Sequence, residues 1–210
     1  MTNFIFIRHG TTEGLETGKL QGSTDSPLSR RGRQQAEMTA RFLSSRRIRA
    51  CFCSPQGRAR ETAAIICQPL GLEPVILEDL REYDFGWLEG HRYFQPPRKH
   101  SSIFIQLKSL ARLLVAVLTG ESLPHLRRRA LQLWHFLLSQ NLDGEIILIT
   151  HGFFINIFIQ EVLKDSGQPP AGIFDVDACS LTTLGIENGQ PILLEVNKTA
   201  HLAEWSGNGH

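Results

Sequence analysis

The sequence has no excess of charge and few cysteines, and each absence excludes a class of protein. Its 210 residues carry 22 Lys and Arg against 21 Asp and Glu, which gives a net charge of +1. This balance offers no electrostatic reason to expect a nucleic acid or a membrane surface as a partner. The four cysteines show neither the spacing of a zinc site nor a dense disulfide framework. Reduced cysteines in a cytoplasmic protein are therefore expected.

Long apolar runs are also missing. The apolar N-terminus meets Arg8 after a few residues, so a secretory signal peptide is not expected. The most apolar predicted helix, Ile103 to Leu118, is interrupted by Gln106, Lys108 and Arg112. It is too short to cross a bilayer, which needs about 20 apolar residues. The length of the chain suits one α/β domain with a sizeable core.

Two short apolar runs end in the same dipeptide, His-Gly. Residues 3–7 lead into Arg8-His9-Gly10, and residues 145–149 lead into Thr150-His151-Gly152. Such runs are typical of strands that are buried on both faces of a parallel sheet. The ligand crevice of an open α/β sheet lies beyond the carboxyl ends of its strands. We therefore expect His9 and His151 to converge on one ligand, with glycines that allow a close backbone approach.

Strands alternate with helices along most of the chain. The predicted strands cover residues 3–7, 49–54, 73–78, 145–149, 178–184 and 191–196, and the predicted helices cover residues 30–45, 56–68, 101–118, 122–139 and a segment after Gly152. This order predicts a single three-layer α/β/α domain over residues 1–210, with a mostly parallel sheet and an antiparallel edge strand. Residues 79–140 interrupt the alternation and are expected to form a helical, lid-like insertion over the crevice.

Arg58 is a third candidate for the site because it lies near the start of the helix that follows strand 49–54. A helix N-terminus attracts anions through its free N–H groups. The planar guanidinium of arginine matches phosphate oxygens and keeps its charge. Arg60 competes with Arg58, but it lies further into the helix, where it can pair with Glu61 or solvent. Together with Arg8 and the two histidines, Arg58 predicts a phosphate pocket.

These residues occur in an order that resembles the histidine phosphatase superfamily, also called the phosphoglycerate mutase-like family. The resemblance covers almost the whole chain, and the ordered set is far more specific than Arg-His-Gly alone. The matching segments are Arg8 to Thr12, Gln21-Gly22 with Asp25 to Ser29, Gly32 with Gln35-Ala36, Ser54 to Ala63, Leu80 to Gly86 with Glu89-Gly90, Gly120 to Ser122 with Arg129, His151-Gly152, and Asn197 to Leu202. Gln21-Gly22 and the chain length look more like the phosphatase branches than like the longer glycolytic mutases.

The resemblance implies a role for each catalytic candidate. His9 would attack phosphorus and become a phosphohistidine, while Arg8, Arg58 and His151 would surround the phosphoryl oxygens. Glu82 would protonate the leaving oxygen and then activate water. Elementary chemistry agrees, because a neutral imidazole has a free lone pair, and phosphoryl transfer needs positive charge around the equatorial oxygens. A backbone carbonyl of the following loop is expected to hold the other ring nitrogen of His9. No metal and no cofactor is required.

Glu82 has competitors for the acid role in Asp79, Asp84 and Glu89. The family's Glu-x-x-x-Gly pattern, matched here from Glu82 to Gly86, selects Glu82. The remaining histidines lack the context of a strand end. Those expected on the surface or on helix faces are His91, His100, His125 and His135, and His201 is expected to be structural.

The expected substrate-binding residues are Thr12, Gln21, Gly22 and Gly152. Many relatives carry an asparagine seven positions after the first arginine of the motif, where it touches the phosphoryl group. This chain has Leu15 there, and a leucine side chain cannot donate a hydrogen bond. The contact is therefore missing or comes from another residue, such as Thr12 or Gln21.

The sequence thus predicts a metal-independent phosphomonoesterase that acts on a small phosphorylated metabolite through a phosphohistidine on His9. Three alternatives stay open. A phosphoglycerate mutase would need a second carboxylate-binding cluster, and a catalytically weak regulatory or binding protein on the same fold would fit the loss of the asparagine. A metal hydrolase that uses His9 and His151 lacks clustered His/Asp spacing. No nucleic acid and no membrane is expected as a partner, and a homodimer stays open.

Overall fold

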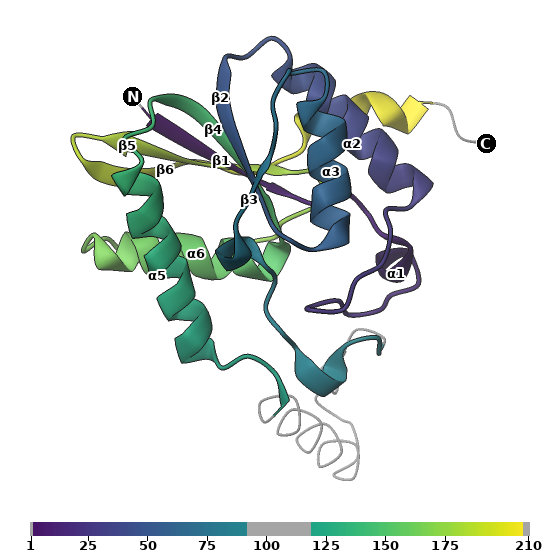
Figure 1. Cartoon of the computed structure of the whole chain (residues 1–210), viewed down its shortest axis with the longest axis horizontal. Coiled ribbons are helices and arrows are strands. Elements are labelled where there is room, and N and C mark those ends of the chain that lie inside the picture. Colours follow the sequence, from purple (N-terminus) through teal and green to yellow (C-terminus); the bar gives the residue numbers. More distant parts are fainter. Residues whose placement is uncertain (1, 92–118, 208–210) are drawn as a thin grey trace.

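A computed structural model describes residues 2–91 and 119–207. Six strands form one sheet in the order β3-β2-β4-β1-β5-β6 (Figure 1). The strands are β1 (Thr2–Arg8), β2 (Ile48–Cys53), β3 (Val75–Ile76), β4 (Gly144–Thr150), β5 (Leu181–Glu187) and β6 (Gln190–Lys198). Strands β1 to β4 pair in parallel, whereas β5 runs antiparallel to both of its neighbours, β1 and β6. The predicted mostly parallel sheet with an antiparallel edge is confirmed.

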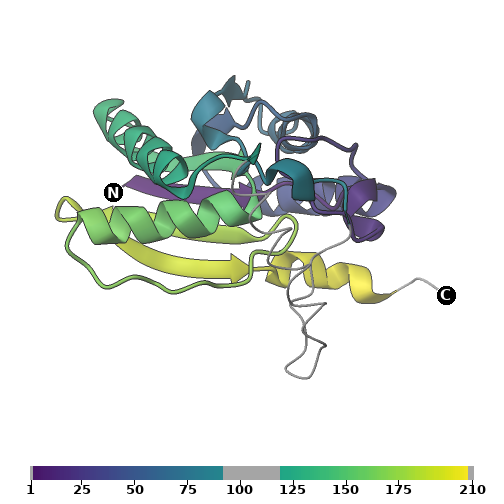
Figure 2. The same cartoon turned by 90° about the horizontal axis from the view of Figure 1, so that it is seen from below.

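Helices cover both faces of this sheet and complete three layers (Figures 1 and 2). One face carries α2 (Arg30–Leu43) and α3 (Gly57–Cys67), and the other carries α5 (Leu123–Ser139) and α6 (Gly152–Asp165). The shorter elements are α1 (Glu13–Glu16) and the 3-10 helices η1 (Glu78–Leu80), η2 (Gly86–Leu88) and η3 (Ala200–Gly207).

The alternation of side chains along β1 builds two separate cores. Phe4 and Phe6 pack with α5 and α6, whereas Ile5 and Ile7 pack with α2 and α3. None of the four is more than 1% exposed, and full burial of such a side chain contributes about 1.5–3 kcal/mol. β1 is therefore a central strand with no solvated face, as its uninterrupted apolar run predicts.

Local signals explain where the main helices begin. The Ser29 hydroxyl caps α2 by accepting from the Gly32 N–H at 3.2 Å. Ser122 caps α5 in the same way, and Pro124 in the first turn is preorganised for a helix. The predicted strand over 73–78 is shorter than expected, since only Val75 and Ile76 pair with β2. Pro74, which precedes them, has no N–H to donate to a ladder.

Helix α5 belongs to the predicted insertion of residues 79–140, and the structure shows what it packs against. Leu126, Leu133, Trp134 and Leu137 of this helix are buried in the same core cluster as β1 and α6. A helix with such an apolar stripe forms part of a layer, and the lid over the crevice stays a prediction. The predicted helix over 101–118, with the rest of 92–118, lies outside the described residues.

Two glycines allow the loop after β1 to touch the start of α2. A Cβ on Gly10 would lie 2.5 Å from the carbonyl oxygen of Gly32, and a Cβ on Gly32 would lie 2.0 Å from that of Thr11. No other residue fits this contact without a backbone shift. The loop that follows His9 is therefore fixed against a helix by direct backbone contact.

Cysteine placement agrees with the expected reduced state. Cys51, Cys53, Cys67 and Cys179 are all free and buried. Within residues 2–91 and 119–207, no helix has the length and apolar character needed to cross a membrane.

Candidate active site

The site lies where the three central strands β2, β4 and β1 end side by side. Arg8 pairs with Thr150 in the ladder between β1 and β4, and Cys53 pairs with Ile149 between β2 and β4. The residues that follow these strands, His9, His151 and Ser54, therefore meet at one edge of the sheet. The centroids of the His9 and His151 rings are 5.0 Å apart. The predicted convergence of the two histidines is confirmed.

Each ring nitrogen of His9 has a hydrogen-bond partner, a backbone carbonyl for Nδ1 and an arginine for Nε2. Its Nδ1 donates to the carbonyl oxygen of Gly10 at 2.8 Å, as predicted, so the neutral ring keeps its lone pair on Nε2. Nε2 accepts from the Arg58 Nε–H at 3.3 Å. Burial lowers the pKa of His9 well below its ordinary value, and the charges of Arg58 and Arg8 lower it further against the opposing effect of Gly10. The ring is neutral near pH 7.

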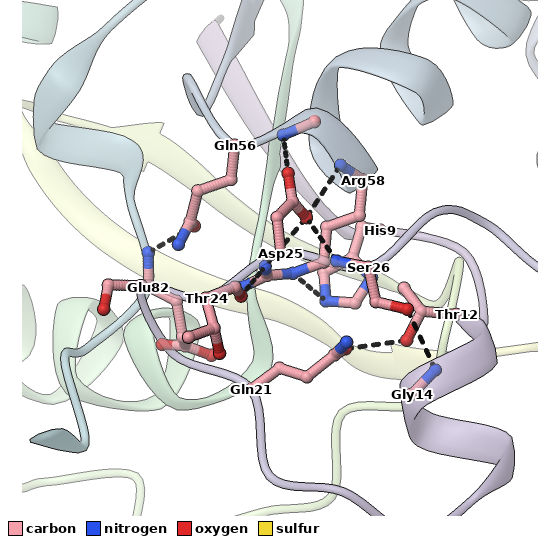
Figure 3. Close-up of polar contacts among 12 residues, drawn as sticks. His9, Thr12, Gly14, Gln21, Thr24, Asp25, Ser26, Gln56, Arg58 and Glu82 are labelled. Carbon is pink, nitrogen blue, oxygen red and sulfur yellow. Dashed lines mark hydrogen bonds and ion pairs between the residues drawn. The ribbon is translucent and has the colours of Figure 1, made fainter. Parts of the chain in front are cut away.

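Arg58 is fully buried at the start of α3 and is fixed by several acceptors (Figure 3). Its NH1 donates to the Thr24 carbonyl at 2.8 Å and to Asp25 Oδ1 at 3.1 Å. Its NH2 donates to the Gly22 carbonyl at 2.8 Å. These bonds leave the guanidinium in one orientation, with Nε toward His9. A fixed, charged fork of this kind suits the oxygens of a phosphoryl group.

Asp25 was not assigned a role from sequence. Its carboxylate accepts from the backbone N–H groups of Gly57 and Arg58, the latter at 3.3 Å. The N-terminus of α3, expected to attract a phosphate, is thus capped by a side chain of the protein itself. Asp25 also pairs with the guanidinium of Arg58, so one carboxylate holds both the helix and its arginine. Because the two segments are distant in sequence, no local pattern could have shown this.

His151 is completely buried, and only one of its two ring nitrogens has a hydrogen-bond partner among the described residues. Its Nε2 lies 2.8 Å from Ser54 Oγ, whereas its Nδ1 is buried without a hydrogen-bond partner among the described residues. Burial lowers the pKa of His151 well below its ordinary value, helped by the charges of Arg58 and Arg8. His151 is therefore also a neutral ring, with a polar atom unsatisfied.

Arg8 borders the same space. Its NH1 donates to the Val176 carbonyl at 2.7 Å, and its buried Nε has no partner among the described residues. Its side chain passes close to Gly152, where a Cβ would lie 3.5 Å from Arg8 Nε. This distance is an ordinary van der Waals contact, so Arg8 does not require a glycine here, and the role of Gly152 toward a substrate stays a prediction.

Glu82 is a buried carboxylate, only 7% exposed, held by backbone donors. Oε1 accepts from the N–H groups of Tyr83 at 2.8 Å and Phe154 at 2.9 Å, and Oε2 accepts from Phe153 at 3.2 Å. Burial raises the pKa of Glu82 above its ordinary value, although these bonds and the charge of Arg58 oppose the rise. A carboxyl whose pKa is raised can carry a proton to a reacting group.

The competing carboxylates have local tasks. Asp84 accepts from the Gly86 N–H at 2.7 Å. Glu89 accepts from the N–H groups of Ser23, Thr24 and Phe85, and thereby ties the Gly22–Asp25 loop to the loop that follows Glu82. Both carboxylates thus hold loops, and the role of Glu82 as the acid stays a prediction.

The remaining predicted residues are distributed around this centre. Gly22 presents its carbonyl to Arg58. Thr12 donates to Gln21 Oε1 at 2.7 Å and accepts from the Leu15 N–H at 3.1 Å, so these two side chains bond to each other at the start of α1. Leu15 lines a cavity of about 690 Å³ that also includes Arg8 and Thr11. The roles of Thr12 and Gln21 toward a substrate stay predictions.

The other histidines agree with their predicted positions. His91, His125 and His135 are exposed, and His201 lies between the Thr39 hydroxyl and the Cys179 carbonyl. His100 lies outside the described residues. Within residues 2–91 and 119–207, no group of three or more His, Cys, Asp or Glu side chains is arranged to hold a metal ion.

This fold and this cluster define a class of protein that comparison with known sequences identifies directly. The chain belongs to the histidine phosphatase superfamily (branch 1), whose family model matches residues 4–199. The resemblance predicted from the motifs is confirmed.

Particular relatives of this chain carry two kinds of name. It is 27% identical over 201 residues to "Putative phosphoserine phosphatase 2" of Hydrogenobacter thermophilus, covering 96% of this chain and 98% of that one. It is 28% identical over 169 residues to "Probable phosphoglycerate mutase GpmB" of Erwinia tasmaniensis, covering 78% and 75%. Among solved structures, it is similar to a phosphoserine phosphatase from Entamoeba histolytica in complex with 3-phosphoglyceric acid. That similarity has a TM-score of 0.77 and 31% identity, covering 96% of this chain and 100% of the other.

Proposed function

We propose that the chain is a metal-independent phosphomonoesterase of a small phosphorylated metabolite and works through a phosphohistidine on His9. The observation that carries the proposal is the environment of the His9 Nε2 lone pair. Nδ1 is tied to Gly10, and the Arg58 guanidinium stands at Nε2. An uncharged nucleophilic nitrogen beside a fixed cation is what attack on a phosphate dianion requires.

Two unsatisfied polar atoms beside His9 support the same reading. Arg8 Nε and His151 Nδ1 are buried without protein partners among the described residues. A hydroxyl proton donated from Ser54 to His151 Nε2 leaves the ring proton on Nδ1. Arg8 and His151 then each offer an N–H donor. Buried groups of this kind often mark a catalytic role, and the equatorial oxygens of a transferring phosphoryl group would satisfy both.

The proposed reaction has two steps. First, His9 Nε2 attacks phosphorus, the bond from phosphorus to the ester oxygen breaks, and Glu82 gives its proton to that oxygen. Second, Glu82 takes a proton from a water molecule whose oxygen attacks phosphorus, and the bond to Nε2 breaks. The products are an alcohol and inorganic phosphate, and His9 returns to its neutral form. Burial, which raises the pKa of Glu82, favours a carboxyl that is protonated in the first step.

The names of the relatives support a small ester as the substrate. The phosphoserine phosphatase from Entamoeba histolytica was crystallised with 3-phosphoglyceric acid, so phosphorylated three-carbon acids are the first compounds to test. The mutase names favour a second candidate, in which the phosphohistidine passes its group to an acceptor alcohol. The two differ in the fate of the phosphoryl group, which is free phosphate for a phosphatase and a new ester for a mutase.

A cytoplasmic location is proposed with this activity. The four free cysteines are all buried in the core, which suits a reducing compartment.

The test is a panel of phosphate monoesters, assayed with and without EDTA. We expect phosphate release from at least one ester in the presence of EDTA, inhibition by vanadate, and an acid-labile phosphoryl label on the protein. Vanadate can adopt the five-coordinate shape of the transferring group. Phosphate release that stops with EDTA and returns with a divalent ion would contradict the proposal. Transfer of label to 3-phosphoglycerate without phosphate release would replace it with the mutase.

A further inference from the structure

Gln56 occupies the N-cap position of α3, yet its side chain does not cap the helix. An N-cap side chain usually accepts from the first free N–H groups of its own helix. Here Asp25 accepts from the N–H groups of Gly57 and Arg58. The side chain of Gln56 is therefore available for other partners, although it lies directly between the loop of Asp25 and the acid Glu82.

The amide of Gln56 joins the two halves of the site (Figure 3). Its Oε1 accepts from the backbone N–H of Glu82 at 2.9 Å. Its Nε2 donates to the carbonyl oxygen of Gly22 in a short hydrogen bond. The same carbonyl accepts from Arg58 NH2 at 2.8 Å, and Arg58 Nε donates to His9. An unbroken path of hydrogen bonds therefore runs from the acid through Gln56 and Arg58 to the nucleophile.

The two partners of this amide make opposite demands. Glu82 offers an N–H and needs an acceptor, whereas Gly22 offers a carbonyl and needs a donor. A primary amide supplies both on one rigid plane, which a carboxylate or an apolar side chain cannot do. The hydroxyl of Ser54, which donates its proton to His151, accepts from the backbone N–H of Gln56 at 3.4 Å. Gln56 therefore contacts the Gly22 loop, the Glu82 loop and the serine that holds His151.

We infer that Gln56 is a positioning residue that sets the place of the Glu82 carboxyl relative to the phosphoryl pocket. The inference rests on the proposed function. The carboxylate of Glu82 is oriented by N–H groups of Tyr83, Phe153 and Phe154, but its main chain is fixed to the pocket through Gln56. Since proton transfer requires the donor within hydrogen-bond reach of the leaving oxygen, a shift of this main chain should slow the first step.

The test compares Gln56→Met with wild type on two esters in the single-turnover burst. Methionine keeps the length of the side chain and removes both hydrogen bonds. For an alkyl phosphate we expect the burst to slow by about 10- to 100-fold, the scale of a misplaced catalytic group. For p-nitrophenyl phosphate, whose leaving group needs no proton, we expect the burst to slow by less than about threefold. Inhibition by inorganic phosphate, which reports on the pocket itself, should change by less than about threefold.

Two further variants separate positioning from damage to the fold. Gln68→Met changes an exposed glutamine at the other end of α3, and it should leave both bursts unchanged. Gln56→Glu keeps an acceptor for the Glu82 N–H but loses the donor to Gly22. Protonation of the new carboxyl restores a donor, so its defect on the alkyl ester, relative to wild type, should shrink as the pH falls toward about 4.3, the ordinary pKa of a glutamate.

Each outcome decides the inference. Burst rates equal to wild type in both Gln56→Met and Gln56→Glu would overturn the positioning role of Gln56. So would an equal slowing of the burst on both esters that does not change with pH. In either case the phosphatase proposal stands. A wild-type protein that never carries label on His9 would overturn the proposed function, and this inference with it. If Gln56→Met does not fold, the pH response of Gln56→Glu decides alone.

Discussion

The rings of His9 and His151 lie 5.0 Å apart, centroid to centroid, because the strands that precede them pair in register. Arg8 is the ladder partner of Thr150, so the next residue of each strand enters the same space. The two rings differ in the hydrogen bonding of their Nδ1 atoms. His9 Nδ1 is bound to Gly10, whereas His151 Nδ1 has no partner among the described residues. In the proposed reaction, the first ring is the nucleophile and the second is a hydrogen-bond donor.

Replacing His9 by alanine should abolish phosphate release and the acid-labile label, since the proposed reaction forms the bond to phosphorus on His9 Nε2. The matched control is His125→Ala, which removes an exposed histidine on α5 that pairs with Glu121. Phosphate release and quench-trapped label are the measurements. Turnover by His9→Ala at the wild-type rate would show that the nucleophile lies elsewhere.

Glu82→Gln should slow the burst on an alkyl phosphate far more than on p-nitrophenyl phosphate. An alkoxide needs a proton as it leaves, and general acid catalysis contributes about 10²–10⁴-fold. Asp84→Asn is the control, because asparagine keeps the Oδ1 that accepts from Gly86. A loss that depends on the leaving group in the control, and not in Glu82→Gln, would move the acid role to Asp84.

The free enzyme should contain His9 as the neutral tautomer with its proton on Nδ1, even at pH 6. Burial and the charges of Arg58 and Arg8 lower the pKa of His9 well below its ordinary value, so protonation requires a more acidic solution. NMR of ¹⁵N-labelled histidine can read both charge and tautomer, with His9→Ala assigning the signal. A His9 ring that is half protonated at pH 6.5 would contradict the described environment.

Stability should fall in acid partly through Glu89. Burial raises the pKa of Glu89, but hydrogen bonds from Thr24, Ser23 and Phe85 outweigh it and lower the pKa below the ordinary value. A depressed folded-state pKa stabilises the native state above the unfolded pKa, about 4.3, and this contribution is lost as the pH falls through the folded value.

Urea unfolding of wild type and Glu89→Gln at several pH values measures this contribution. The difference in unfolding free energy should be largest above about pH 5 and should shrink in acid. Glu37→Gln, in an exposed pair with Arg41 at 4.0 Å, is the control and should show little difference at any pH. A Glu89→Gln difference that grows as the pH falls would refute the assignment.

The sequence predicted those residues whose roles depend only on their neighbours in the chain. The strand-end histidines, the Ser29 cap and the Gly10 carbonyl at His9 follow from short-range rules on burial, turns and tautomers. It missed Asp25 and Gln56 because their partners are distant in sequence. It did not show that α5 packs in the core, because an apolar stripe fits both a lid and a core helix until the contacts of Trp134 with Phe4 and Phe158 are known.

The direct backbone contact between Gly10 and Gly32 restricts which residues these two positions can carry. A methyl group at either position would collide with the opposite main chain, and the loop that follows the nucleophile would have to leave α2. Because that collision is present with or without substrate, a library selected only for folded protein, with no demand for phosphate release, should still return glycine at both positions. The position of His9 is therefore fixed by the requirement to fold, whether or not the protein is selected for activity.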